Sequence, residues 1–289
     1  MNKMASTKEI KEFKENGYFI LHNFLTEDEV ESMKEECKNL VEKMNPVEHY
    51  SSFHIEDHEH SERDEYFLTS SDKVRFFFED GAFNNRGELV MPKHRSLNKI
   101  GHALHWLCPA FKKVTFSQKV KDLISSLGYE DPAVVQSLYI FKHPEVGGMV
   151  KAHQDSTFLH TDPPSVLGLW FPLEEVTLDN GCLKFVPGSH KGPLYERLKR
   201  NPKNEGPSLI MEGQKIEFEE SQYVPCPVPK GSCVVIHGLV VHKSEKNLSS
   251  KPRPVYTFHV VEQKNTVYSP ENWLQPTPEY SFPSFNSLA

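Results

Sequence analysis

The N-terminal part of the chain carries two helix-start signatures. Ser6-x-x-Glu9 is a capping-box pattern, in which two side chains satisfy backbone N–H groups at the start of a helix, and Gly17 supplies a natural end for that helix. Thr26-x-x-Glu29 repeats the pattern, and apolar residues then recur at helical spacing as far as Pro46. The pattern predicts a short helix before Gly17, a strand over Tyr18 to Leu25, and a longer amphipathic helix after that strand.

Strand signals dominate the second half of the chain. Two further helical candidates, Ile100 to Phe111 and Ser117 to Leu127, come first. Short β-branched and aromatic runs separated by turn residues then follow at Val134 to Phe141, Val166 to Leu173, Leu183 to Val186, Val234 to Val241 and Val255 to Val261. This order predicts a mainly β, double-layered structure with helices packed on one side. We expect one domain over residues 1–289, with a mainly helical elaboration over 1–132 and the β core over 133–265.

The composition excludes several classes of protein. The formal net charge is -7, whereas a nucleic-acid-binding surface needs a clustered excess of Lys and Arg. No stretch reaches the roughly 18 consecutive apolar residues of a membrane span. The five cysteines are widely spaced and form no C-x-x-C pair, which predicts reduced thiols. We therefore expect a cytosolic or nuclear monomer with neither a nucleic-acid nor a membrane partner, and the C-terminal Ser287-Leu288-Ala289 does not support peroxisomal import.

Two copies of an H-x-D pattern offer candidate metal ligands. On a strand, residues i and i+2 point to the same face, so His153 and Asp155 can reach one ion. His160 and Asp162 repeat the pattern, but Pro163-Pro164 follows directly and ends any strand there. The first copy follows a Gly-Gly turn and begins a fresh extended segment. We therefore favour His153 and Asp155.

A second cluster of polar residues follows a later apolar run. A non-haem Fe(II) oxygenase holds its metal with two His and one carboxylate, so the site needs a second His from a distant strand. His242 follows the run Val234 to Val241, with Ser244 two residues later and Arg253 entering the last strand. A guanidinium can hold the far carboxylate of a chelating keto diacid bidentately, and the hydroxyl of Ser244 can add a hydrogen bond. His237 competes with His242 for the metal.

Together these motifs resemble the phytanoyl-CoA dioxygenase family over nearly the whole chain. The resemblance is carried by His153-Gln-Asp155, by Asn180-Gly-Cys-Leu-Lys-Phe-Val-Pro-Gly-Ser-His190, and by His242-x-Ser244-x-x-Asn247 followed by Arg253. It implies a double-stranded β-helix of the jelly-roll, cupin-like type with N-terminal and packing helices. It also implies Fe(II), the co-substrate 2-oxoglutarate and O₂.

The resemblance also implies residue roles. It makes His153, Asp155 and His242 the iron ligands and catalytic residues. It makes Arg253 and Ser244 co-substrate ligands, and it places Lys99, Leu138 and Trp170 along the 2-oxoglutarate pocket. The expected reaction couples decarboxylation of 2-oxoglutarate to succinate and CO₂ with hydroxylation of a small-molecule or acyl substrate that the sequence does not identify.

Alternatives stay open at this point. A metal-binding β-barrel that binds a small molecule without turning it over would use the same ligands, and a zinc hydrolase would need a carboxylate base that is not evident. The polar segment 48–66, with His54, His58 and His60, reads as a solvated loop or as a lid over the active site.

Overall fold

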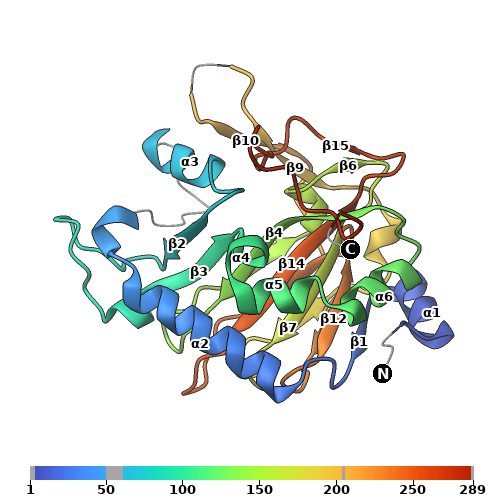
Figure 1. Cartoon of the computed structure of the whole chain (residues 1–289), viewed down its shortest axis with the longest axis horizontal. Coiled ribbons are helices and arrows are strands. Elements are labelled where there is room, and N and C mark those ends of the chain that lie inside the picture. Colours follow the sequence, from blue (N-terminus) through green and yellow to red (C-terminus); the bar gives the residue numbers. More distant parts are fainter. Residues whose placement is uncertain (1–3, 50–60, 204–205, 288–289) are drawn as a thin grey trace.

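Two antiparallel sheets and a layer of helices form the protein (Figure 1). The computed structural model describes residues 4–49, 61–203 and 206–287. The helices are α1 (Thr7–Asn16), α2 (Glu27–Lys43), α3 (Ser61–Leu68), α4 (Leu104–Leu107), α5 (Pro109–Thr115) and α6 (Gln118–Ser126). The expected lid segment 48–66, with its three histidines, lies largely outside the described residues.

The larger sheet has seven strands and the smaller has four. In spatial order the larger sheet contains β1 (Tyr18–Leu21), β12 (Cys233–His237), β7 (Leu167–Pro172), β14 (Val255–Glu262), β4 (Pro132–Ile140), β3 (Leu97–His102) and β2 (Val74–Phe78). The smaller sheet contains β11 (Val224–Cys226), β8 (Leu183–Phe185), β13 (His242–Ser244) and β5 (Val150–His153). Two short pairs complete the set: β9 (Glu196–Arg200) with β10 (Leu209–Gly213), and β6 (Thr161–Asp162) with β15 (Val267–Tyr268).

Side chains of the central strands alternate between the two faces of the larger sheet, so each face packs against its own layer. In β7, Leu167, Leu169 and Phe171 belong to the core that contains the buried residues of α2, α5 and α6, whereas Trp170 belongs to a core shared with the smaller sheet. Successive side chains of a strand point to opposite faces, so β7 is buried on both sides. Figure 1 shows these helices lying across one face of the larger sheet.

The smaller sheet packs on the other face of the larger one. The ring of Phe185 in β8 stacks on Tyr18 of β1, with ring centroids 4.0 Å apart, and Val234 and Ile236 of β12 belong to the same apolar cluster. This cluster lies at the Arg253 side of the interior, because it also includes Val255 at the start of β14.

Both capping boxes form as predicted. Ser6 and Glu9 cap α1, which ends at Gly17 in the left-handed region with φ 84°, and Thr26 and Glu29 cap α2. The helix predicted over Ser117 to Leu127 is α6. The prediction of a mainly β chain with packing helices is confirmed.

Three boundaries were predicted wrongly. Residues 100–102 are not helical, because they belong to β3, which pairs with both β2 and β4, and only α4 and α5 follow as short helices. The strand expected over 18–25 ends at Leu21. The run expected to reach Val241 stops at His237, because the chain turns there: the N–H of Val240 donates to the carbonyl of His237 at 2.9 Å. Three strands, β1, β2 and β3, also fall in the part expected to be mainly helical.

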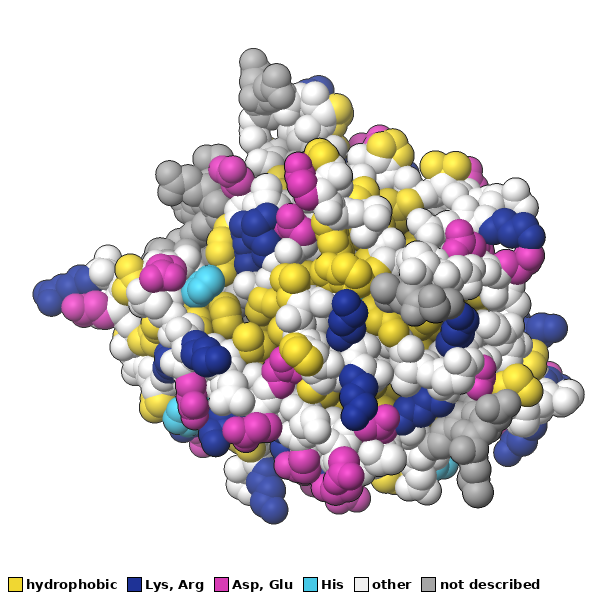
Figure 2. Space-filling model, in the orientation of Figure 1, with side chains coloured by type: hydrophobic (Ala, Val, Ile, Leu, Met, Phe, Trp, Pro, Cys, Tyr) yellow, Lys and Arg dark blue, Asp and Glu magenta, His cyan; other side chains and the backbone are white. Residues whose placement is uncertain are grey.

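The surface and the cysteines agree with the composition. Figure 2 shows acidic and basic side chains interspersed over one face, with hydrophobic side chains gathered over α4 and the C-terminal segment. All five cysteines are buried and free. No helix in the described ranges has the length and apolar character that a membrane span requires.

The cap of α2 gives a stability test. Thr26 Oγ1 accepts from the N–H of Glu29 at 3.2 Å, and the Glu29 carboxylate accepts from the N–H of Thr26 at 2.8 Å. Thr26→Ala should lower the free energy of unfolding by about 1 kcal/mol, because it removes the side-chain acceptor. Denaturant unfolding measures the change, with Thr26→Ser as the matched control that keeps the hydroxyl. Equal stability of the alanine and wild-type proteins would contradict the role of the cap.

Candidate metal centre

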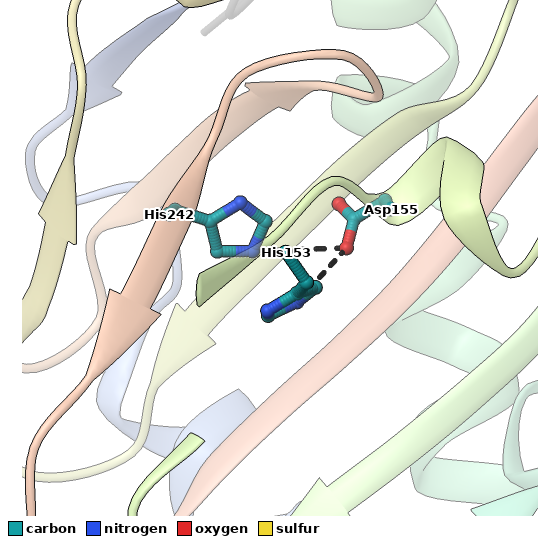
Figure 3. A group of neighbouring side chains, drawn as sticks. All are labelled: His153, Asp155 and His242. Atoms are coloured by element: carbon teal, nitrogen blue, oxygen red, sulfur yellow. Dashed lines mark ion pairs between the residues drawn. The ribbon is translucent and has the colours of Figure 1, made fainter. Parts of the chain in front are cut away.

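Three candidate ligands converge between the two sheets (Figure 3). His153 is the last residue of β5 and His242 is the first residue of β13, and the two are direct partners across the antiparallel ladder. Asp155 begins a short 3₁₀ helix two residues after His153. Of the described residues, only these three form a group of His, Cys, Asp or Glu whose ligand atoms lie within 4.8 Å of one another.

The distances suit one shared ion. Asp155 Oδ1 lies 3.6 Å from His153 Nε2 and 3.7 Å from His242 Nε2, and the two imidazole centroids are 4.2 Å apart. Ligands about 2.0–2.2 Å from one metal are separated by distances of this order. Two imidazole nitrogens and one carboxylate oxygen on one side of an ion leave other positions open, and this is the donor set that non-haem Fe(II) sites use.

Both imidazoles have their Nε2 atoms free for a metal. His153 Nδ1 lies 2.8 Å from the carbonyl of Lys151, and His242 Nδ1 lies 3.0 Å from the carbonyl of Val240. A carbonyl accepts only from a protonated nitrogen, so the proton resides on Nδ1 and the lone pair on Nε2. Backbone carbonyls thus set the tautomer and the ring orientation, as they do in known metal sites.

The electrostatics favour the charge states that bind a metal. Burial alone would raise the pKa of Asp155, but the imidazoles of His259, His242 and His153 hold that pKa well below its usual value. Burial and the neighbouring His153 lower the pKa of His242 to about 4. At neutral pH the site therefore presents an ionised Asp155 carboxylate and a neutral His242 imidazole.

Exposure differs among the three ligands. The side chain of His153 is 20% exposed, compared with 8% for Asp155 and 6% for His242. The centre is therefore more accessible on the His153 side. There the ring of Phe158 packs against His153, with centroids 5.8 Å apart.

Gln154 explains how His153 and Asp155 share a face although Asp155 is not in a strand. Gln154 keeps an extended backbone with φ -113° and ψ 139°, so the alternation continues one residue beyond β5. Its amide points away from the ligands, donates to the carbonyls of Pro193 and Leu239, and accepts from the N–H of Tyr195. The residue between the two ligands is thus tied to the surrounding chain by three hydrogen bonds.

The competing candidates lie elsewhere. Thr161 and Asp162 of the second H-x-D copy form β6 and pair with β15, and His160 is held through its backbone by Asn272. His237 ends β12, where its Nδ1 accepts from the N–H of Leu239, and its ring lies 5.6 Å from Phe13 of α1. Neither His160 nor His237 belongs to the ligand group.

Arg253 is a buried cation without an acidic partner in the described part of the chain. Its guanidinium donates to the carbonyls of Asn180 and Gly181 and to the hydroxyl of Ser244, at 3.3, 2.9 and 3.3 Å. The Trp170 ring lies 5.3 Å from its central carbon. Burial lowers the pKa of Arg253 to about 10, which still leaves it charged. A buried cation costs several kcal/mol unless an anion accompanies it, so this pocket fits an anionic ligand.

The side chains of Leu138 and Lys99 share the inner face with Trp170. Thr257 of β14 pairs with Trp170 of β7 on one side and with Leu138 of β4 on the other. Ile140 lies two residues after Leu138, on the same face of β4, and pairs with Lys99 of β3. Lys99 is a strand residue, and burial lowers its pKa to about 7.

The sequence reasoning missed Lys142. It follows β4, is 3% exposed, and its ammonium donates to the carbonyl of Gly148 at 2.9 Å. Burial and the nearby Arg253 lower the pKa of Lys142 to about 7. Gly181 links the two cations, because a Cβ there would lie 2.9 Å from Lys142 Cε, while its carbonyl accepts from Arg253. Lysine after a strand is common, so the sequence held no signal for it.

Comparison with protein families and relatives supports one assignment. The phytanoyl-CoA dioxygenase (PhyH) family model matches residues 13–255. Phytanoyl-CoA dioxygenase domain-containing protein 1 of Bos taurus is 47% identical over 283 residues, which cover 96% of this chain and 97% of the bovine protein. The Caenorhabditis elegans homologue is 45% identical over 94% of this chain and 96% of its own length, and a phytanoyl-CoA dioxygenase of Arabidopsis thaliana is 41% identical over 94% and 95%.

Solved structures share the fold. The epimerase SnoN in complex with Fe³⁺, alpha ketoglutarate and nogalamycin RO superposes with a TM-score of 0.65 at 15% identity, over 96% of this chain and 91% of SnoN. EctD from S. alaskensis, with 2-oxoglutarate and 5-hydroxyectoine, gives a TM-score of 0.59 at 18% identity, over 92% of this chain and 79% of EctD. The double-stranded β-helix expected from the motifs is thereby confirmed, as two antiparallel sheets without a closed barrel.

Metal addition tests the centre directly. Co(II) at a hundredfold excess over its dissociation constant should add about 2.7 kcal/mol to the free energy of unfolding of the wild-type protein, because the ion binds only the folded state. His242→Ala should abolish this gain. His237→Ala is the matched control and should keep it, even if it lowers the stability of the apoprotein. Thermal or denaturant unfolding with and without the ion measures the gain, and a normal gain in the His242 variant would exclude the centre.

Proposed function

Because the chain belongs to the phytanoyl-CoA dioxygenase family, we propose that it is an Fe(II)- and 2-oxoglutarate-dependent dioxygenase. The reaction decarboxylates 2-oxoglutarate to succinate and CO₂ and hydroxylates a small-molecule or acyl substrate. His153, Asp155 and His242 hold the iron, and Arg253 holds the far carboxylate of the co-substrate. Bound iron with 2-oxoglutarate and O₂ supplies the oxidising chemistry that no amino-acid side chain provides.

One observation carries the proposal: the same interior contains a His-Asp-His cluster and a buried guanidinium that has no acidic partner among the described residues. The cluster alone suits many metal proteins, and the guanidinium alone suits any anion. They are joined by β13, since His242 begins that strand and Ser244, the acceptor of Arg253, ends it. A ligand that chelates a metal at one end and carries a carboxylate at the other satisfies both groups at once.

The chain's own residues act by placing and shielding the reactants. Ser244 donates to the carbonyl of Gly181 at 2.9 Å and accepts from Arg253, so it holds the guanidinium in one orientation. The Trp170 ring lies over that guanidinium, and Arg253 is 2% exposed, so little water reaches it. Removal of water strengthens the attraction between Arg253 and a carboxylate, because the local dielectric is low. The three ligands supply no acid or base, and their part is to hold one ion with open positions.

Lys142 and Lys99 add positive charge to the same interior. The buried Glu79 interacts electrostatically with both lysines. Burial raises the pKa of Glu79, so it is a weak counterion. Glu245, which is more exposed, also lies near Lys142, and Arg253 has no acidic partner among the described residues. The interior therefore holds an excess of positive charge before any ligand binds. A dianion such as 2-oxoglutarate offsets this excess, whereas a neutral ligand does not.

Turnover of 2-oxoglutarate tests the proposal. With Fe(II) and a reductant, the wild-type protein should release CO₂ and succinate even without a primary substrate, although slowly. Asp155→Ala should lower this activity by more than the roughly 10- to 100-fold that loss of a residue supporting a metal ligand costs, because it removes a ligand itself. Arg253→Met should raise the KM for 2-oxoglutarate more than it lowers kcat, because it removes binding of the far carboxylate.

The exposed Arg86 provides the control. Arg86→Met removes one cation from the surface and should leave both kinetic constants unchanged. Absence of any 2-oxoglutarate turnover in the iron-loaded wild-type protein, across candidate substrates, would contradict the proposal and favour a protein that binds metal and ligand without catalysis.

The pH dependence of co-substrate affinity tests the role of the lysines. Lys142 and Lys99 each have a pKa lowered to about 7, so each ammonium is present below that pH and is lost as the pH rises through it. 2-Oxoglutarate stays a dianion in this range, so its affinity should fall as the pH rises from about 6.5 to 8.5. Calorimetry with the Co(II)-loaded protein measures the affinity. Lys142→Met should weaken binding at pH 6.5 and flatten the slope, whereas Lys113→Met, at an exposed position, should do neither.

A further inference from the structure

Three cross-strand partners of the larger sheet lie beside the metal-ligating carboxylate. His259 of β14 pairs with Gln136 of β4 on one side and with Gly168 of β7 on the other. His259 and Gln136 are 7% and 6% exposed. They lie on the inner face together with Thr257 and Leu138, and so they face the smaller sheet that carries His153 and His242.

His259 contacts the oxygen of Asp155 that the metal ligands leave aside. Its Nε2 lies 3.3 Å from Asp155 Oδ2, whereas Oδ1 is the atom near both ligand imidazoles. Oδ2 is buried and has no well-aligned hydrogen-bond partner among the described residues. The two oxygens of one carboxylate therefore face different groups, the ligand histidines and the supporting sheet.

Gln136 contacts the His259 nitrogen that does not face Asp155. The Gln136 side-chain amide lies 3.2 Å from His259 Nδ1. If its N–H donates to Nδ1, the proton of a neutral imidazole resides on Nε2, the atom that lies 3.3 Å from Asp155 Oδ2. If the amide is turned so that its oxygen accepts from Nδ1, a lone pair on Nε2 faces a carboxylate oxygen, which is repulsive. The charge of Asp155 therefore selects the first arrangement.

Gly168 makes the contact sterically possible. A Cβ at this position would lie 3.1 Å from Asp155 Oδ2, 3.3 Å from Ile236 and 3.6 Å from the His259 ring. The strand β7 thus comes close to the carboxylate and leaves space for it between the backbone and the imidazole. The three cross-strand partners thus all act on Asp155 Oδ2. Gly168 leaves space for this atom, His259 faces it, and Gln136 orients His259.

We propose that His259, oriented by Gln136, is a positioning residue that reserves Asp155 Oδ2 and leaves only Oδ1 for the metal. A carboxylate bound through one oxygen occupies one coordination position instead of two. A metal held by these three ligands would then keep positions open for 2-oxoglutarate and O₂. This inference rests on the proposed function, because it concerns how the same centre holds its ion.

Metal binding by the otherwise ligand-free protein tests the inference without turnover. Co(II) serves as the probe, since its visible absorption depends on coordination number, and titration gives its affinity. His259→Leu should weaken Co(II) binding about 10- to 100-fold, the range for loss of a group that supports a ligand, and should change the absorption spectrum. His259→Gln retains side-chain N–H groups and should restore most of the affinity and the wild-type spectrum.

Gln136→Met is the second variant, which tests the inference should His259→Leu fail to fold. It has similar volume but no polar group, so Nδ1 loses its partner, and Co(II) affinity should fall by a smaller factor with a spectral change in the same direction. His160→Leu, in the other H-x-D copy, is the control and should alter neither property. Folding of each apoprotein is followed by circular dichroism.

The outcomes separate this inference from the proposed function. If the wild-type protein does not bind Co(II), the proposed metal centre itself is wrong. If the wild-type protein binds Co(II) and the folded His259→Leu or Gln136→Met variants show the same affinity and spectrum, the positioning role is wrong while the centre stands. A His259→Gln variant no better than His259→Leu would also overturn it, because the N–H group would then have no part.

Discussion

The pairing of β5 with β13 is the constraint on which the candidate centre depends. It brings together two residues that are 89 positions apart in the chain, His153 and His242, as direct neighbours on one ladder. Antiparallel partners lie about 4.5–5.5 Å apart at Cα, so the register alone places the two imidazoles within reach of one ion. A shift of one residue would turn one of them to the opposite face. Burial of Phe185 in β8, which is also a partner of His242, opposes such a shift.

Charge is distributed unevenly within the interior, and this limits what can bind there. Arg253 and Lys142 lie near one another, and the raised pKa of Glu79 makes it a weak counterion. Such an arrangement lowers stability in the absence of a ligand, since desolvated like charges repel. The protein keeps it because the backbone carbonyls of Gly181 and Gly148 satisfy the N–H groups of these cations without neutralising their charge. The site is thus organised for an anion before the anion arrives.

The sequence was informative where function depends on a local pattern. The capping boxes at Ser6 and Thr26, the pair His153 and Asp155, and the spacing of His242 and Arg253 are all visible along the chain, and the motifs they form led to the correct family and fold. Local reading failed at Ile100, which looks helical by its apolar spacing but joins β3, because pairing with two neighbouring strands outweighs weak local preference.

The residues that the sequence did not indicate act through partners far along the chain. His259 matters because of Gln136, which is 123 residues away, and nothing near His259 in the sequence indicates that pairing. Lys142 likewise gains significance only through Arg253. Roles of this kind depend on cross-strand register, which a hydrophobic pattern does not specify at the level of single residues. The roles of Lys99, Leu138 and Trp170 as pocket residues stay predictions, although all three lie on the inner face.

The candidate metal centre is built from a few strands whose motifs are visible in the sequence, which is why the reaction is easier to infer than the substrate. The smaller sheet carries the histidines, the larger sheet supports the carboxylate, and the segment before β14 supplies Arg253. On the more exposed His153 side of the centre, Phe158 packs in a different apolar cluster. That cluster also contains Phe67 and Trp273, which stack with centroids 3.9 Å apart and come from α3 and the C-terminal segment. The accessible side of the centre is thus bordered by segments outside the ladder that joins the two histidines, and the motifs that indicate the reaction do not include these segments.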